Sequence, residues 1–297
     1  GSGYTEAAPA GRKTIRRSTG ELIRLWSDFP GSPPAGGALS AAAARFNWTL
    51  LGAGFSLALA AAAGLWALPD RWAGWARDGC ETANCYCEPL SGRLVAQPLA
   101  AYSNLGFILA GLLMLAAPRD PESRTLIRSR PEYAAMFAAT ALGTGLGSFF
   151  YHASLTRLGE WFDLVGLYLF TSFLLVYGLA RLTRRPAPGR WVAVYAGINL
   201  AGGLQMAWAR EWQQVVFALL AAGALAAEAG VLIQARPRIE PRYLAAALAC
   251  FAGGAALWVT PCSAGLPFPP HAGWHLLAAA TQLWLFAYYR SERPLGS

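Results

Sequence analysis

The sequence predicts an all-α membrane protein, a polytopic helical bundle. Of its 297 residues, 55% are hydrophobic and only 13% are charged, and mean hydropathy is positive at +0.34. Soluble globular domains rarely have this balance. Apolar stretches recur along the chain, each close to the roughly 20 residues that one helix needs to cross a bilayer core about 30 Å thick. Backbone polar groups must bond within each such segment, so the spans are expected to be helices.

Residues 1–45 differ in composition from the rest of the chain. They are rich in Pro, Gly, Ser and Arg, as in RKTIRRSTG and FPGSPPAGG, and lack apolar periodicity. Such a segment buries too little apolar surface to fold, so we expect a flexible basic cytoplasmic tail. Residues 46–297 are expected to form one transmembrane helical domain.

Hydropathy and charge together predict eight spans. The segments are 48–68, 101–117, 131–155, 161–183, 190–209, 212–234, 243–260 and 271–289. Lys and Arg are retained on the cytoplasmic side during insertion, and with the N-terminus inside, 19 basic residues fall inside and five outside. Both termini are therefore expected in the cytoplasm. Arg outnumbers Lys 23 to 1 and Ala is frequent, which favours a GC-rich bacterial source and hence an inner membrane.

The net charge of +8 does not indicate nucleic-acid binding, because the basic residues occupy alternate loops and form no patch with interleaved aromatics. The expected partner is the bilayer and a lipid within it. The sequence leaves the oligomeric state open.

Four of the five cysteines, Cys80, Cys85, Cys87 and Cys262, fall in outer loops, and Cys250 falls within a span. An oxidising compartment would permit disulfides there, but the sequence does not tell which pairs form. The thiols lack the spacing of a zinc ribbon, which disfavours a thiolate metal site.

The three histidines of the chain each lie near the outer end of an expected span. His271 and His275 are four residues apart, so they share one helix face and can bind a single ion. His152 ends a helix that runs outward and reaches the same depth, where it can supply a third ligand. Three protein ligands leave a position for water or substrate, as in catalytic zinc sites. Imidazole also suits iron, copper and nickel, so zinc is a preference.

Two further polar residues accompany the histidines. Asp163 follows His152 across a short loop, and a carboxylate near an open metal position can act as general base. Ser148 lies one turn before His152 on the same face, where its hydroxyl can donate to an oxyanion. Taken singly, Asp163 can instead be a helix-terminal charge, Ser148 can bond to its own helix, and a histidine can simply join two helices.

These motifs resemble those of the alkaline ceramidase family, within the CREST superfamily of seven-helix membrane hydrolases that includes the adiponectin receptors. The matching segments are S-F-F-Y-H-A-S-L at 148–155, H-A-G-W-H at 271–275, Y-C-E at 86–88 and Q-P-L-A-A-Y-S-N-L at 97–105. The resemblance covers about residues 85–290. It implies seven family helices and leaves 48–68 as an additional N-terminal span.

The resemblance implies roles for particular residues. By similarity, His152, His271 and His275 bind zinc, Asp163 activates water and Ser148 assists the transition state of amide hydrolysis in a sphingolipid. Ser103 and Asn104 match a family S-N pair, which implies hydrogen bonds that orient the metal ligands.

The chain departs from the family where the eukaryotic ceramidases hold calcium. Pro89 and Leu90 follow Glu88, and Gln97 stands where an acid is expected, so a calcium site is doubtful. Leu164 replaces the acid that usually follows the family aspartate, as in bacterial members.

We therefore expect a zinc-dependent hydrolase of ceramide or a related N-acyl lipid, acting at the outer leaflet. The alternative is a signalling protein similar to adiponectin receptors, with a retained zinc site and little turnover. A haem protein is disfavoured because two ligands share one helix face. Acyl length, and hydrolysis against reverse synthesis, are left open.

Overall fold

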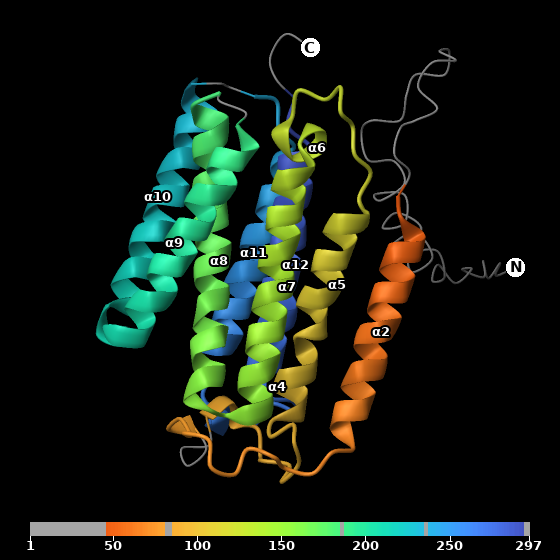
Figure 1. The fold of residues 1–297 in the computed structure, drawn as a ribbon, viewed down its shortest axis with the longest axis vertical. Helices are drawn as coiled ribbons and strands as arrows, with labels where there is room; N and C mark the ends of the chain where they lie inside the picture. The colour runs from red at the N-terminus through yellow and green to blue at the C-terminus, as the bar shows by residue number, and fades with distance from the viewer. Residues whose placement is uncertain (1–45, 81–84, 185–186, 235–236, 294–297) are drawn as a thin grey trace, which may run out of the picture. The chain divides into compact units, whose positions relative to one another are not determined.

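The computed structural model describes residues 46–80, 85–184, 187–234 and 237–293, so the expected basic tail lies outside the described residues. The described part of the chain is helical and has no β-strand. Its long helices are α2 (Trp48–Trp66), α5 (Leu105–Ala116), α7 (Pro131–Ser154), α8 (Arg157–Leu182), α9 (Pro188–Trp208), α10 (Gln213–Gln234), α11 (Pro241–Trp258) and α12 (Pro270–Arg290). Short helical turns are η1 (Cys85–Cys87), α4 (Pro98–Ser103), α6 (Leu126–Ser129), η2 (Arg210–Trp212) and η3 (Cys262–Ala264). Figure 1 shows the long helices running side by side.

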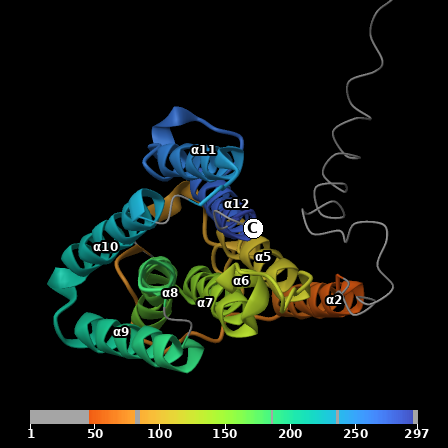
Figure 2. The ribbon, with the colours of Figure 1, turned by 90° about the horizontal axis from the view of Figure 1, so that it is seen from above.

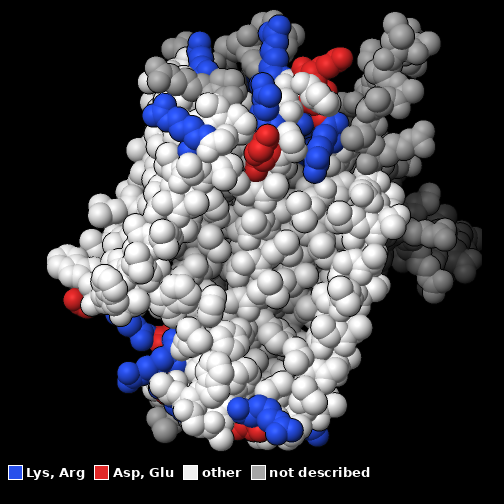
Figure 3. Space-filling view, in the orientation of Figure 1, with Lys and Arg blue, Asp and Glu red and all other residues white. Residues whose placement is uncertain are grey.

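Among the residues that the structure describes, five helical segments are long and apolar enough to cross a membrane, which is consistent with a multi-pass membrane protein. They are α2, α4 with α5, α7, α8, and η2 with α10. On the face shown in Figure 3, the charged residues gather toward the two ends and leave an uncharged band between them.

The other three expected spans correspond to α9, α11 and α12, helices of 21, 18 and 21 residues. Helix α12 contains His271, His275 and Gln282, which are all buried. Polar side chains that face the bundle interior lower the mean hydropathy of a helix without exposing anything polar to lipid. The helices thus lie where the eight segments are expected, while the number of crossings stays a prediction.

Helix α7 lies at the centre of the bundle. It packs against α5 on one side and α8 on the other, α8 also contacts α9 and α10, and α12 packs against α11, α5 and α4. Figure 2 shows this arrangement along the helix axes, with α2 at the edge next to α5. Only Ala62 of α2 is buried, which suits a helix added to the outside of a bundle.

Helices α4 and α8 begin three and four residues earlier than expected, and each start has a local cause. Helix α8 begins at Arg157 because the Thr156 side chain accepts a hydrogen bond from the Gly159 amide at 3.0 Å, a standard N-cap. Helix α4 begins at Pro98, and the Glu88 carboxylate accepts from the next amides, at 2.6 Å from Leu99 and 2.8 Å from Ala100. As a result Asp163 lies in the second turn of α8 and not at its start.

Candidate metal centre

The three histidines meet at one end of the bundle. All three are buried, and each offers a ring nitrogen within 4.8 Å of the nitrogens of the others. The ring centroids of His271 and His275 are 4.5 Å apart, and that of His152 is 4.9 Å and 5.0 Å from them. The cluster can therefore bind one metal ion, as the spacing in the sequence predicts, although the identity of the metal is not shown.

His152 lies in the last turn of α7, where the carbonyls lack partners within the helix. The segment before α4 supplies these partners. The backbone N–H of Ala96 donates to Ala153 O, and the backbone N–H of Gln97 donates to His152 O, both at 3.0 Å. The same pairing brings the Gln97 side chain to His152, with Oε1 2.8 Å from Nδ1. Because an amide oxygen only accepts, His152 carries its hydrogen on Nδ1 and leaves the Nε2 lone pair free.

His275 is also oriented by hydrogen bonds at its Nδ1 atom, but to different residues. Its Nδ1 lies 3.0 Å from the Ala100 carbonyl oxygen and 2.8 Å from Ser103 Oγ. The Ser103 hydroxyl itself donates to Ala100 O at 2.7 Å, so its oxygen is left to accept from His275. The Asn104 amide nitrogen lies 3.3 Å from the same Nδ1. The Nε2 of His275 is again the atom left for a metal.

Buried imidazole nitrogens that have no hydrogen-bond partner indicate whether the cluster suits a metal ion. His152 Nε2 and His271 Nδ1 are buried and have no hydrogen-bond partner. Leaving such a group unsatisfied costs about 1–3 kcal/mol. Three neutral imidazoles with converging lone pairs are a donor set that zinc accepts, so the residues present fit a metal.

Ser148 joins the cluster to Asp163. Its Oγ lies 3.4 Å from His275 Nε2, and its side chain also makes a hydrogen bond with Asp163. Asp163 comes from α8 and approaches because α7 and α8 are close at this level. A Cβ atom on Gly147 would lie 2.9 Å from the Phe162 carbonyl carbon and 3.4 Å from the Asp163 amide nitrogen, so only glycine allows this approach.

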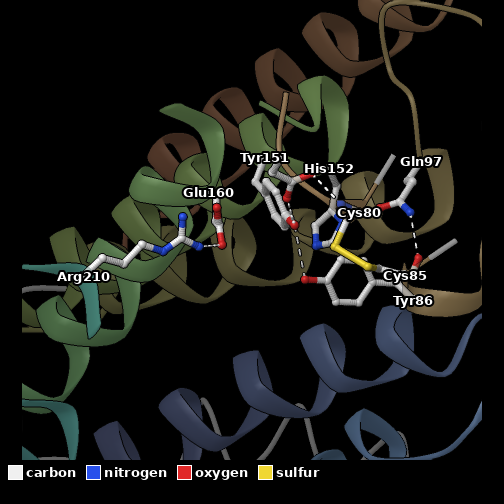
Figure 4. The surroundings of a disulfide bond; sticks show 9 residues. Cys80, Cys85, Tyr86, Gln97, Tyr151, His152, Glu160 and Arg210 are labelled. Carbon is white, nitrogen blue, oxygen red and sulfur yellow. Dashed lines mark hydrogen bonds and ion pairs between the residues drawn. A yellow bond between two sulfur atoms is a disulfide. The ribbon is translucent and has the colours of Figure 1, made fainter. Parts of the chain in front are cut away.

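A tyrosine lies over the histidines. The Tyr86 ring centroid is 4.0 Å from that of His271 and 5.0 Å from that of His152. Tyr86 lies between two disulfide-bonded residues, Cys85 paired with Cys80 and Cys87 paired with Cys262. The four cysteines expected in outer loops are thus all paired, which accounts for their thiols without a metal. Figure 4 shows the Cys80–Cys85 bond beside Tyr86 and His152.

The structure brings all the predicted site residues together at one end of the bundle, and their roles stay predictions. Two neighbours that sequence reasoning did not assign to the site are Gln97 and Tyr86. Gln97 could have been found from the sequence, because a side-chain amide directly before an apolar helix needs a buried hydrogen-bond partner. Tyr86 had none beyond its place in the Y-C-E motif.

No protein-family profile and no curated protein matches this chain. What the site can do therefore follows from its chemistry. Three imidazoles that can bind a metal, with a hydroxyl that is hydrogen-bonded to a carboxylate beside them, are the components of metal-assisted hydrolysis.

Proposed function

We propose that this chain is a zinc-dependent integral-membrane amide hydrolase that cleaves ceramide or a related N-acyl lipid into a fatty acid and an amine. The observation that carries the proposal is the link of three buried histidines, through Ser148, to the carboxylate of Asp163. The motif resemblance to alkaline ceramidases supports the same reaction and supplies the substrate class.

Zinc held by His152, His271 and His275 would polarise the amide carbonyl and lower the pKa of water at the site toward about 7. Asp163 is the residue placed to take a proton from the attacking water. Ser148 reaches toward both the carboxylate and the ligand nitrogen of His275, so its hydroxyl can donate to the oxygen of the carbonyl as negative charge develops. Gln97 and Ser103 hold the imidazole rings in the required tautomer.

A groove next to the site supports a lipid substrate. It has a volume of about 570 Å³ and lies between the end of α2, the start of α4 and the loop before α12. Trp66, Leu99, Tyr102 and Phe268 make its wall largely apolar, and Pro270, which precedes His271, lines it. An acyl chain resting there would contact Pro270 and Cys87, the neighbours in sequence of His271 and Tyr86.

Eight membrane crossings, with both termini in the cytoplasm and the site on the periplasmic side of a bacterial inner membrane, complete the proposal. Two of the five basic residues expected on the outer side support this orientation. Arg77 donates to Ser154 O at the end of α7 at 2.8 Å, and Arg157 begins α8, so both lie at the end of the bundle that holds the histidines. The positive-inside rule then assigns this end to the outer side.

The experiment is a screen of purified protein in detergent against N-acyl lipids of different head group and chain length, with products detected by mass. We expect free fatty acid from at least one amide and none from a diacylglycerol of the same acyl chain. Zinc at one ion per chain with no product from any amide would instead favour the receptor class, in which the site is retained and turnover is incidental.

A further inference from the structure

The three-residue turn Cys85–Cys87, called the strap below, holds Tyr86 against the histidine cluster. The Tyr86 ring is tilted by 34° over His271 and meets His152 edge-on. Its hydroxyl lies 3.3 Å from that of Tyr151, which in turn donates to Asp78. None of these contacts has a part in the hydrolysis proposed above.

The strap is covalently tied on both sides of Tyr86. One disulfide joins Cys85 to Cys80, and the other joins Cys87 to Cys262, a sequence separation of 175 residues. Cys262 lies in the loop that leads into α12, the helix that carries two of the histidines. The second disulfide therefore connects the strap to the loop before the helix that carries His271 and His275.

The backbone of the strap also depends on these ties. Tyr86 and Cys87 have φ values of 71° and 60°, in the left-handed region that residues with a Cβ seldom adopt. Residues in such conformations persist only where the surrounding structure holds them. Opening either disulfide would remove part of that restraint and allow the strap to relax.

One side chain links the strap directly to a ligand. The Gln97 amide nitrogen donates to the Cys85 carbonyl at 3.0 Å, and the Gln97 carbonyl oxygen faces His152 Nδ1 at 2.8 Å. Figure 4 shows both contacts. A displaced strap would therefore disturb the orientation of His152 as well as uncover His271.

We propose that the strap is a disulfide-locked cover of the metal site, with Tyr86 as a positioning residue that keeps the His271 and His152 rings in place and shields the bound ion from exchange with water. This proposal rests on the metal site of the proposed function and adds the element that retains the ion. It does not require Tyr86 to contact substrate.

The test is the rate at which zinc-loaded protein in detergent loses its ion to an excess of a chromophoric chelator. Tyr86→Ala, and separately the double change Cys87→Ser with Cys262→Ser, should speed zinc loss by about 10-fold or more, the usual effect of removing a group that supports metal ligands. Tyr86→Phe should restore the slow rate, because the ring contacts remain. Cys250→Ser, a change at the cysteine outside both disulfides, is the matched control and should leave the rate unchanged.

The visible spectrum of the cobalt-substituted protein gives a second readout that overall stability would not move. The spectrum of Tyr86→Ala should differ from that of the unchanged protein, and the spectrum of Tyr86→Phe should match it. If Tyr86→Ala does not fold, as judged by circular dichroism, Tyr86→Leu takes its place and the cysteine pair is measured alongside.

Equal rates of zinc loss in all these proteins would overturn the cover while leaving the hydrolase proposal intact. Failure of the unchanged protein to hold any metal would overturn both. A fast rate in Tyr86→Phe equal to that of Tyr86→Ala would show that the ring does not act as the cover.

Discussion

Single residues decide whether the three imidazoles can share one ion. Gln97 and Ala100 each accept a hydrogen from the Nδ1 of a histidine, which turns the Nε2 lone pairs of His152 and His275 inward. A histidine without such a partner would sample both tautomers and both ring flips. Sequence spacing puts the three rings in reach of one another, and these acceptors orient two of them, His152 and His275, so that each can bind a metal through Nε2.

Asp163→Asn tests the general base. The variant should keep its metal, because Asp163 is not among the three clustered ligands, and should lose turnover by about 10² to 10⁴-fold, the range for a positioned base. Turnover and zinc content are measured on the same preparation. Asp120→Asn, at a carboxylate paired with Arg128, is the control, and turnover of Asp163→Asn at its level would refute the assignment.

Gln97→Leu tests the support of His152. The replacement keeps a similar volume but cannot accept the Nδ1 hydrogen, so zinc affinity should fall by about 10 to 100-fold. Competition with a chelator of known affinity measures the change. Gln205→Leu removes a glutamine of α9 that accepts a hydrogen bond from Tyr168 of α8, and it should leave zinc affinity unchanged. An equal loss in both variants would indicate a general packing effect.

The sequence was sufficient to predict that the histidines, Ser148 and Asp163 lie close together, because polar side chains are rare and costly in apolar segments and therefore stand out. Tyr86 lies in a loop, where no periodicity relates position to environment. The pairing of Cys80 with Cys85 and of Cys87 with Cys262 depends on loop conformation, which the spacing of cysteines does not determine.

Among the elements, the contact between α7 and α8 sets the geometry of the site. Gly147 lets the α8 backbone approach one residue before Ser148, and the Thr144 hydroxyl donates across the same interface to Gly166 O at 3.1 Å. Small residues allow such close approach in membrane bundles. The two helices bring Ser148 and Asp163 together, although 14 positions of sequence and a reversal of direction separate them.

Gly147→Ala should force α8 away from α7 and move Asp163 off Ser148. We expect a loss of stability of about 1–3 kcal/mol, typical of an overpacked contact, with reduced turnover and unchanged zinc content. Thermal unfolding in detergent and the lipid assay provide the measurements. Gly52→Ala, at a position in α2 with nothing within 4 Å, is the control, and identical behaviour of the two variants would contradict the account.

Hydropathy predicted the helical segments well because most of the apolar runs correspond to one long helix each. The starts of α8 and α4 were misplaced by several residues, since Thr156 and Glu88 cap amides that precede the apolar runs. Capping depends on the contact of one side chain, and a hydropathy value averaged over many residues does not detect it. The break at Asn104 between α4 and α5 was also missed, because apolar residues continue on both sides of it.

At the scale of the whole molecule, a largely buried ionic cluster joins α8, α10 and the end of α12 through residues that do not contact the histidines. Arg181 of α8 pairs with Glu228 of α10 and, at 2.9 Å, with Glu292 beyond α12. Tyr288 also donates to Glu228 at 2.8 Å. Such a cluster fixes how the helices meet, whereas the histidines and disulfides fix the site.

Arg181→Met should therefore destabilise the whole bundle. Removing one partner of a buried ion pair leaves unpaired charge inside and costs about 3–5 kcal/mol, which thermal unfolding in detergent would report as a large fall in Tm. The control is Arg242→Met, since Arg242 and Glu240 form a pair with side chains 64% and 52% exposed, and such pairs contribute about 0–1 kcal/mol. Similar Tm values for the two variants would show that the cluster does not hold the helices together.

Whether the three histidines hold a metal is decided by metal stoichiometry, measured by elemental analysis of the purified protein. We expect one zinc ion per chain, lost when His152→Ala or His275→Ala removes a ligand and retained in Asp163→Asn. Protein that is folded but carries no zinc and takes none up, or zinc that stays bound after either histidine is replaced, would contradict this expectation.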